Sequence, residues 1–127
     1  MQEGNAVSIF ATGHLVWEAI GACEILEAKG IQAELINIHT IKPLDEKAVL
    51  ESVAKTGCAV TAEEHQVNGG LGDSIAQLLG RNRPAPMEMV GVNDSFGESG
   101  TPAELMKKYG LTKERIAEKA LQAISRK

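Results

Sequence analysis

Aromatic side chains are scarce in this sequence. They make up 3% of its 127 residues, and acidic residues outnumber basic ones by 17 to 13. Stacking on bases needs aromatic side chains and binding to a phosphate backbone needs basic ones, so we expect no nucleic-acid partner. No apolar run approaches the ~18–20 residues of a membrane span, and Met1-Gln2-Glu3-Gly4 lacks the basic start of a signal peptide. We therefore expect a cytoplasmic chain without a membrane partner.

Cysteine is almost as rare. Cys23 and Cys58 lie far apart, and neither belongs to a Cys-x-x-Cys pair, so redox or zinc chemistry has no local support. Cys23 shares a helical stripe with Val16, Ile20 and Leu26. Both thiols are predicted to be small residues of the core.

Short β-branched runs alternate with amphipathic stretches along the chain, a pattern typical of βαβ units around a parallel sheet. Hydrophobic residues make up 43% of the sequence, enough for a core. We predict one α/β domain over residues 1–127, with three α/β/α layers and four parallel strands in the order 2-1-3-4. The expected strands are 7–11, 33–38, 58–62 and 87–92, and the expected helices are 16–28, 45–55, 73–79, 101–110 and one after 112.

Helix ends carry specific signals. Gly30 is expected in a left-handed conformation after the first helix, and Asp45, just beyond Pro43, is expected to cap the second. Thr101-Pro102-Ala103-Glu104 is a capping box, and Thr112 is expected to cap the last helix. That helix has an expected apolar stripe of Ile116, Ala120, Leu121 and Ile124, and the strand centres predicted to be almost fully buried are Ile9, Ile36, Val60 and Val90.

Polar residues follow the expected strands, where parallel sheets bind ligands. Three histidines and three carboxylates gather there: His14, His39, His65, Glu63, Glu64 and Asp94. They suggest a metal or acid–base site, but no spacing fixes two ligands on one element, and loop histidines also cap, hydrogen-bond or face a partner. The order 2-1-3-4 would place Gly13 and His14 opposite Glu64 and His65 across one crevice, which takes either a small ligand or a neighbouring domain.

Two glycine-rich segments are further candidates for a binding site or an interface. Gly69-Gly70-Leu71-Gly72 precedes a helix and is similar to loops that hold phosphate, but it fits neither Gly-x-Gly-x-x-Gly nor the P-loop, and a tight strand-to-helix turn explains it as well. The segment 93–100 is a surface loop in which Phe96, with Gly97 beside it, is expected to anchor a neighbouring surface.

Several blocks together resemble the carboxyl-terminal domain of transketolase, in the right order over almost the whole chain. The blocks are Ala11-Thr12-Gly13, Lys42-Pro43-Leu44-Asp45, Glu63-Glu64-His65, Gly69-Gly70-Leu71-Gly72, Gly91-Val92-Asn93-Asp94-Ser95-Phe96-Gly97-Glu98-Ser99-Gly100 and Tyr109-Gly110-Leu111-Thr112. The last two favour transketolase over deoxyxylulose-phosphate synthase and over the thiamine-dependent components of 2-oxo acid dehydrogenases.

The resemblance implies a division of labour. In that family, two other domains hold thiamine diphosphate and magnesium at a subunit interface, and the carboxyl-terminal domain supports the dimer. It implies two-carbon ketol transfer between sugar phosphates in the pentose phosphate pathway. No catalytic, cofactor-binding or metal-binding residue of the family can be carried over to this chain, which we expect to be inactive alone. The expected interface or ligand edge consists of His14, Glu64, His65, Gly69, Gly70, Gly72, Asp94, Phe96 and Gly97.

The sequence departs from the family in two places. The family domain opens with an antiparallel strand, and only residues 1–5 precede the first parallel strand here. We therefore expect either that this strand has been cut away or that this protein builds its sheet differently. Strand 33–38 should then have an open edge, where a second copy or residues 1–5 would lie. Gly13-His14-Leu15-Val16 stands where many relatives have Gly-Ser-Glu. This variant resembles the one found in transketolases that are split into two polypeptides. The remaining alternatives are a regulatory domain that binds phosphate or a nucleotide, and a docking domain of a dehydrogenase or synthase relative.

Overall fold

The computed structural model describes residues 3–38, 44–66, 70–92 and 111–127. Its elements are β1 (Val7–Ala11), α1 (Leu15–Ala28), β2 (Ala33–Asn37), α2 (Glu46–Thr56), β3 (Ala59–Gln66), α3 (Leu71–Asn82), β4 (Met87–Val92) and α5 (Lys113–Ser125). Within these ranges the predicted alternation of strands and helices is confirmed. The helix expected at 101–110 and the loop at 93–100 lie outside the described residues.

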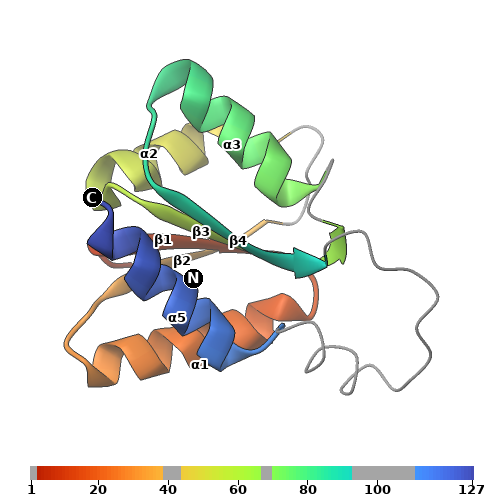
Figure 1. Cartoon of the computed structure of the whole chain (residues 1–127). Helices are drawn as coiled ribbons and strands as arrows, with labels where there is room; N and C mark the ends of the chain where they lie inside the picture. Colours follow the sequence, from red (N-terminus) through yellow and green to blue (C-terminus); the bar gives the residue numbers. More distant parts are fainter. Residues whose placement is uncertain (1–2, 39–43, 67–69, 93–110) are drawn as a thin grey trace.

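The four strands form a parallel sheet in the order β2-β1-β3-β4, as predicted. Helices α1 and α5 cover one face of the sheet, and α2 and α3 cover the other, which gives three layers (Figure 1). From β1 the sheet grows to one side through β2 and to the other through β3. The topological switch point therefore lies between β1 and β3.

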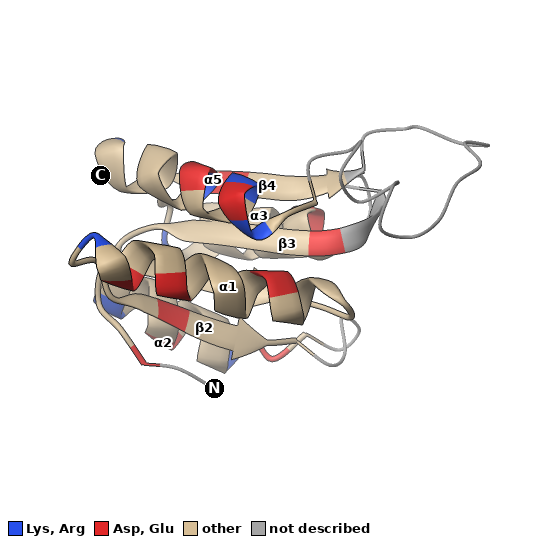
Figure 2. Cartoon of the chain, turned by 90° about the horizontal axis from the view of Figure 1, so that it is seen from below, with Lys and Arg blue, Asp and Glu red and all other residues tan. Residues whose placement is uncertain are grey.

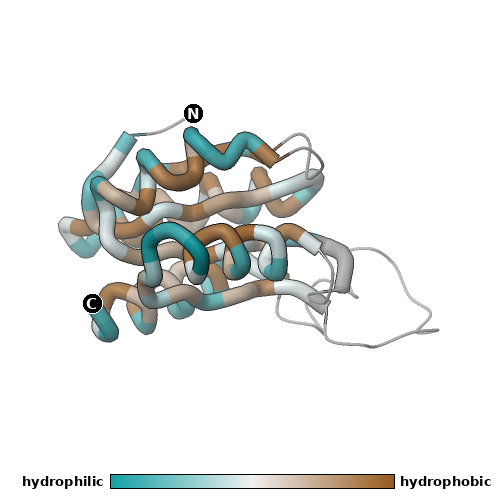
Figure 3. The backbone as a smooth tube through the Cα atoms, turned by 90° about the horizontal axis from the view of Figure 1, so that it is seen from above, coloured by the Kyte–Doolittle hydropathy of each residue, from teal (hydrophilic) through white to brown (hydrophobic). Residues whose placement is uncertain are grey.

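Each face of the sheet has its own hydrophobic cluster. In β1, Ile9 packs with Val60 and Val90 in the cluster under α1 and α5, whereas Phe10 packs with Ile75 in the cluster under α2 and α3. Both faces of β1 are buried, which explains why this strand is apolar at almost every position. Hydrophobic and hydrophilic residues alternate along α2 and α3, as in elements with one buried side (Figure 3).

Two burial predictions are wrong. Ile36 is only half-buried, because β2 lies at the edge of the sheet and its outer flank has no neighbouring strand among the described residues. In α5, Leu121 is 37% exposed, whereas Ala117 and Ala123 are buried. The buried side of α5 consists of Ile116, Ala117, Ala120 and Ala123, and Leu121 lies off that side.

The predicted helix signals in the described ranges are confirmed. The Asp45 carboxylate accepts a hydrogen bond from Ala48 N at 3.1 Å, the Thr112 hydroxyl accepts one from Arg115 N at 3.3 Å, and Gly30 has a φ of 78°. However, β3 runs on to residue 66 and α3 begins at residue 71, so both elements are longer than expected. The end of β3 is polar (Glu63-Glu64-His65-Gln66), so the apolar pattern used to predict the strand stopped at residue 62.

Both cysteines are buried free thiols, as predicted. Burial raises the pKa of the Cys23 thiol to about 11, and the nearby carboxylates of Glu24 and Glu27 add to the effect. Burial also raises the pKa of Cys58, against the opposing charges of Lys127 and Arg126. These thiols therefore stay protonated at neutral pH and act as small hydrophobic residues.

The amino-terminal residues cross the start of β2. The backbone N–H groups of Asn5 and Ala6 both donate to the carbonyl oxygen of Gln32, at 3.2 and 3.0 Å, and Gly4 N lies 3.5 Å from a carboxylate oxygen of Glu34. Among the described residues, β2 has a ladder partner only in β1. The expected open edge is therefore present in this part of the chain, and the described amino-terminal residues contact only its beginning.

Candidate functional site at the carboxyl edge of the sheet

The carboxyl ends of β1 and β3 are tied together. Thr12 N donates to the carbonyl oxygen of Ala62 at 3.1 Å, and Gly13, with a φ of 57°, then turns the chain into α1. His14 follows at the N-cap position of α1 and is exposed. The structure therefore places His14 at the predicted edge of the sheet, next to the end of β3.

The Glu63-Glu64-His65 block forms an irregularity in β3. Ala62 pairs with Val90, and Gln66 pairs with Val92, so four residue steps on β3 face two on β4. Such a bulge bends a strand and changes the direction in which its side chains point. Glu64 and His65 thus belong to the carboxyl end of β3, although their side chains lie outside the described part.

The start of α3 is held by a carboxylate from within the chain. One oxygen of Glu63 accepts a hydrogen bond from Leu71 N at 2.9 Å, and the other accepts one from Gly72 N at 2.7 Å. Glu63 is only 2% exposed, and Gly70 occupies the N-cap position. These amides are the groups with which a glycine loop would hold a phosphate, and here they already have an anionic acceptor.

Gly72 has a packing role of its own. A Cβ atom at this position would lie 2.8 Å from Met89 Sδ and 3.1 Å from Thr61 Oγ1. Glycine therefore allows α3 to approach β3 and β4 closely. For Gly72 the geometry favours the structural interpretation of the glycine segment over the phosphate hypothesis.

Other predicted site residues lie outside the described residues: His39, Gly69, Asp94, Phe96 and Gly97. They remain predictions. Within the described ranges, no three His, Cys, Asp or Glu side chains come together as a group that could hold a metal ion.

Trp17 is a surface feature that sequence analysis missed. It lies in the first turn of α1, where its backbone N–H donates to the carbonyl oxygen of His14 at 3.2 Å, and 74% of the residue is exposed. A large exposed aromatic side chain is typical of protein–protein contacts. Only its position off the apolar stripe of the helix could have indicated this exposure from the sequence.

The outer side of α1 is acidic. Glu18, Glu24 and Glu27 lie along this helix, and Figure 2 shows the acidic positions on the α1 side of the molecule. This charge opposes contact with a phosphate backbone. In the described ranges, no helix combines the length and the apolar character needed to cross a bilayer.

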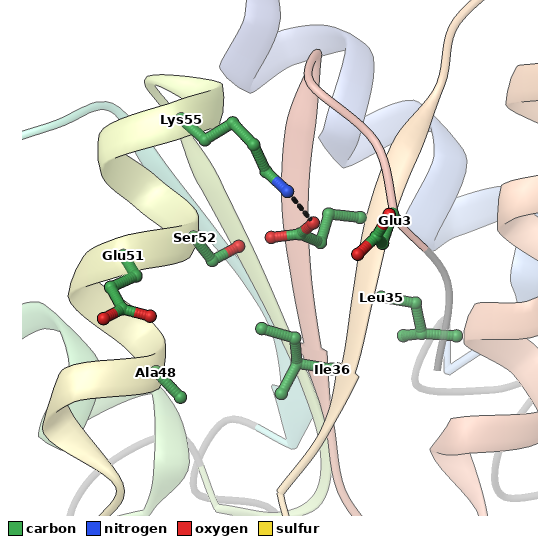
Figure 4. Close-up of a pocket in the computed structure, with 8 residues that line it drawn as sticks. Glu3, Leu35, Ile36, Ala48, Glu51, Ser52 and Lys55 are labelled. Atoms are coloured by element: carbon green, nitrogen blue, oxygen red, sulfur yellow. Dashed lines mark hydrogen bonds and ion pairs between the residues drawn. The ribbon is translucent and has the colours of Figure 1, made fainter.

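A groove of about 470 Å³ lies away from this edge, between β2 and α2 (Figure 4). Its floor includes the ion pair of Lys55 with Glu34. Burial opposes ionisation of Glu34, but hydrogen bonds from Lys55, Ser52 and the backbone of Gly4 outweigh it and hold the pKa of the carboxyl below its usual value. The groove is lined by Glu3, Glu34, Leu35, Ile36, Ala48, Glu51, Ser52 and Lys55.

Hydroxyl groups connect the groove to the core. Ser8 Oγ lies 2.6 Å from both Ser52 Oγ and Thr56 Oγ1, and Thr56 Oγ1 donates to the carbonyl oxygen of Cys58 at 3.1 Å. Buried polar groups are costly unless they are paired, and these hydroxyls are paired with one another. The network therefore fixes α2 against β1 below the groove.

Comparison with known protein families matches residues 1–116 to the family described as transketolase, C-terminal domain. Among curated proteins, 6-deoxy-6-sulfo-D-fructose transketolase subunit SqwH of Clostridium sp. (strain MSTE9) is 50% identical over 127 residues, which cover 100% of this chain and 39% of the relative. The 1-deoxy-D-xylulose-5-phosphate synthase of Caldanaerobacter subterraneus subsp. tengcongensis is 39% identical over 121 residues, which cover 94% of this chain and 20% of that enzyme. This chain thus spans well under half the length of these relatives.

A solved structure shows the same arrangement of elements. It is described as a split gene transketolase in the form of an inactive beta4 tetramer. It superposes on this chain with a TM-score of 0.93 and 44% sequence identity, and the match covers 98% of this chain and 41% of that one.

Proposed function

Because the chain belongs to the transketolase C-terminal domain family, we propose that it is the non-catalytic carboxyl-terminal part of a transketolase and supports assembly of that enzyme. The complete enzyme would transfer a two-carbon ketol unit between sugars. The chain covers 39% of the Clostridium transketolase subunit and 41% of the split-gene transketolase chain, which leaves most of each relative outside the match. The thiamine diphosphate and magnesium sites would lie in the rest of the enzyme.

The observation that carries this proposal is the character of the described carboxyl edge. The amides at the start of α3 bind Glu63, and Trp17 is exposed beside His14. Such an edge fits a protein partner better than a phosphate group. We propose the thiamine-binding part of the same enzyme as that partner, in a complex that forms a homodimer in the cytoplasm.

Complementation tests this proposal. The purified 127-residue chain is mixed with the polypeptide that carries the two thiamine-binding domains, and ketol transfer is measured with thiamine diphosphate and magnesium present. We expect no turnover from this chain alone and restored turnover from the mixture. Donors to compare are fructose 6-phosphate and 6-deoxy-6-sulfo-D-fructose, because the name of the Clostridium relative specifies the latter. Turnover or micromolar cofactor binding by the chain alone would contradict a non-catalytic role.

Interface variants locate the contact. Trp17→Ala, Phe96→Ala and Gly97→Asp should weaken association by roughly tenfold or more, since removal of a buried aromatic anchor costs about 2 kcal/mol. Leu121→Ala is the matched control, because Leu121 is an exposed apolar residue on α5 that does not belong to the proposed edge. Variants at the three edge positions that associate as tightly as the control would remove this edge from the interface.

Two alternatives make different predictions. A regulatory domain that binds phosphate or a nucleotide should gain several degrees in melting temperature from such a ligand at 100 times its dissociation constant, which corresponds to ~2.7 kcal/mol. A docking domain of a 2-oxo acid dehydrogenase or of a deoxyxylulose-phosphate synthase relative should instead associate with those enzymes. One deoxyxylulose-phosphate synthase is 39% identical to this chain, so such an enzyme is a partner to test.

A further inference from the structure

Glu63 is a buried carboxylate to which the proposed function assigns no chemical step. We propose that Glu63 is a positioning residue: its carboxylate serves as a built-in anion that fixes the bulge of β3 to the start of α3 and so sets the shape of the docking edge. The effect on docking rests on the function proposed above. The effect on the fold does not, and the two can be measured separately.

Both carboxylate oxygens of Glu63 accept hydrogen bonds from the start of α3. The donors are two consecutive backbone N–H groups, Leu71 N at 2.9 Å and Gly72 N at 2.7 Å, while Glu63 is 2% exposed. Without Glu63, the first turn of α3 would have two buried N–H groups without these acceptors. Hydrogen bonds to a charged acceptor are stronger than neutral ones, and a negative charge is favoured at the amino end of a helix.

The bulge explains how the side chain reaches this position. Regular pairing between β3 and β4 stops after Ala62 and resumes at Gln66, so Glu63 is the first residue of the irregular segment. Glu64 and His65, which follow Glu63, belong to the expected interface or ligand edge, which is the docking edge of this proposal. A contact that holds Glu63 therefore also holds the backbone from which Glu64 and His65 extend.

Neither close chemical relative of glutamate can replace it. Glutamine keeps the shape, but it has one acceptor oxygen, and its NH₂ group would face a backbone N–H. Aspartate keeps the charge but is one methylene shorter, so its oxygens cannot lie where those of Glu63 lie. The proposal thus requires the charge, the length and both oxygens.

Anion rescue tests the built-in anion directly. Thermal unfolding of the full chain is compared for the natural sequence, Glu63→Ala and Glu63→Gln, at pH 7.5, in sodium formate and in sodium chloride of equal ionic strength. Formate is the probe because it carries the missing carboxylate. We expect Glu63→Ala to melt roughly 5–15 °C lower in chloride and to regain about a third of that loss in formate, with a saturable dependence on formate concentration. The natural chain and Glu63→Gln should not respond.

Glu24→Ala is the matched control, because Glu24 is an exposed carboxylate on α1. It should melt within about 2 °C of the natural chain in both salts, since exposed charges contribute little. If Glu63→Ala does not fold in chloride, the yield of refolding with and without formate replaces the melting temperature. Glu63→Ala that melts like the control, or that gains no more from formate than from chloride, would overturn the proposal. So would a natural chain that gains as much from formate as the alanine variant.

Association with the thiamine-binding polypeptide gives the second measurement. Glu63→Gln, assayed well below its melting temperature, should bind this partner about tenfold more weakly than the natural chain, and formate should strengthen binding of Glu63→Ala. Unchanged binding of both variants would overturn the docking role. If the natural chain itself does not bind, the function proposed above fails, while the melting experiment still decides whether Glu63 acts as a built-in anion.

Discussion

Lys127 Nζ lies 2.9 Å from the carbonyl oxygen of Ala6 and 3.0 Å from that of Thr56. One amine therefore joins the start of β1 to the end of α2. Its neighbour Arg126 donates to the carbonyl oxygen of Met87 at 2.7 Å, which connects α5 to β4. A positive charge at the carboxyl end of a helix is favourable, so the amine also suits the end of α2 electrostatically.

Lys127→Met should lower the free energy of unfolding by about 1 kcal/mol, because two backbone carbonyl groups lose a charged donor. Urea unfolding measures this change, and the slope with urea should stay constant if the fold is unchanged. Lys47→Met is the control, since Lys47 forms an exposed pair with Glu51 at 3.9 Å. Its effect should stay below about 0.5 kcal/mol. Equal effects at the two positions would argue against a structural role for Lys127.

Ile9→Ala should lower the free energy of unfolding by ~2–5 kcal/mol, because Ile9 is fully buried in the central strand β1 and its truncation leaves a cavity. Ile36→Ala is a matched control on the edge strand β2, where the residue is half-buried. The loss there should be about half as large or less, since the surroundings are open to solvent. Chemical denaturation of both variants measures the difference, and a loss below about 0.5 kcal/mol at Ile9 would contradict the burial of β1.

The sheet was predictable because its signals are local and repeated. An apolar run such as the one around Ile9 indicates a strand buried on both faces, and caps such as Asp45 satisfy a helix end within one turn of the chain. Right-handed crossovers then restrict the strand order. Ile36 shows the limit of this reasoning, because the predicted order already placed strand 33–38 at an edge, whereas the apolar character of Ile36 alone suggested full burial.

The candidate site was harder to predict, because its main contacts join residues that are distant in sequence. Glu63 accepts hydrogen bonds from backbone N–H groups eight and nine residues further along the chain. The β-bulge between them has no recognisable sequence signal. An acidic residue at the end of an apolar strand, shortly before a glycine-rich helix start, was the available signal. The groove beside Lys55 was not predictable, since it arises from how α2 packs on β2 and from the position of Glu3.

The pH dependence of stability should depend on Glu34. Its pKa is lower in the folded chain than the value of 4.5 expected when it is free, so the folded state binds fewer protons in this range. By linkage, the contribution of Glu34 is present above about pH 4.5 and is lost as the pH falls through its lower folded pKa. Glu34→Gln should flatten this part of the profile. Urea unfolding between pH 3 and 7 measures it.

Glu51→Gln provides the control for this profile, because Glu51 also lines the groove but is largely exposed. Its profile should follow that of the natural chain. If Glu34→Gln loses stability on acidification as steeply as the natural chain, then Glu34 and Lys55 do not account for the acid sensitivity of the fold.

Two glycines of α3 should respond in opposite ways to the same change. Gly72→Ala places a methyl group 2.8 Å from Met89 Sδ and 3.1 Å from Thr61 Oγ1, so either these side chains or the start of α3 must shift, and we expect a loss of ~1–3 kcal/mol. Gly80→Ala meets no atom within 4 Å, and alanine is the better helix former, so we expect a gain of about 0.5–1 kcal/mol. Both changes add one methyl group to α3. The free energies of unfolding from chemical denaturation therefore compare the cost of a steric contact at Gly72 with the gain in helix propensity at Gly80. A Gly72→Ala variant at least as stable as the natural chain would show that α3 does not need its close approach to the sheet, and the structural interpretation of this glycine would be wrong.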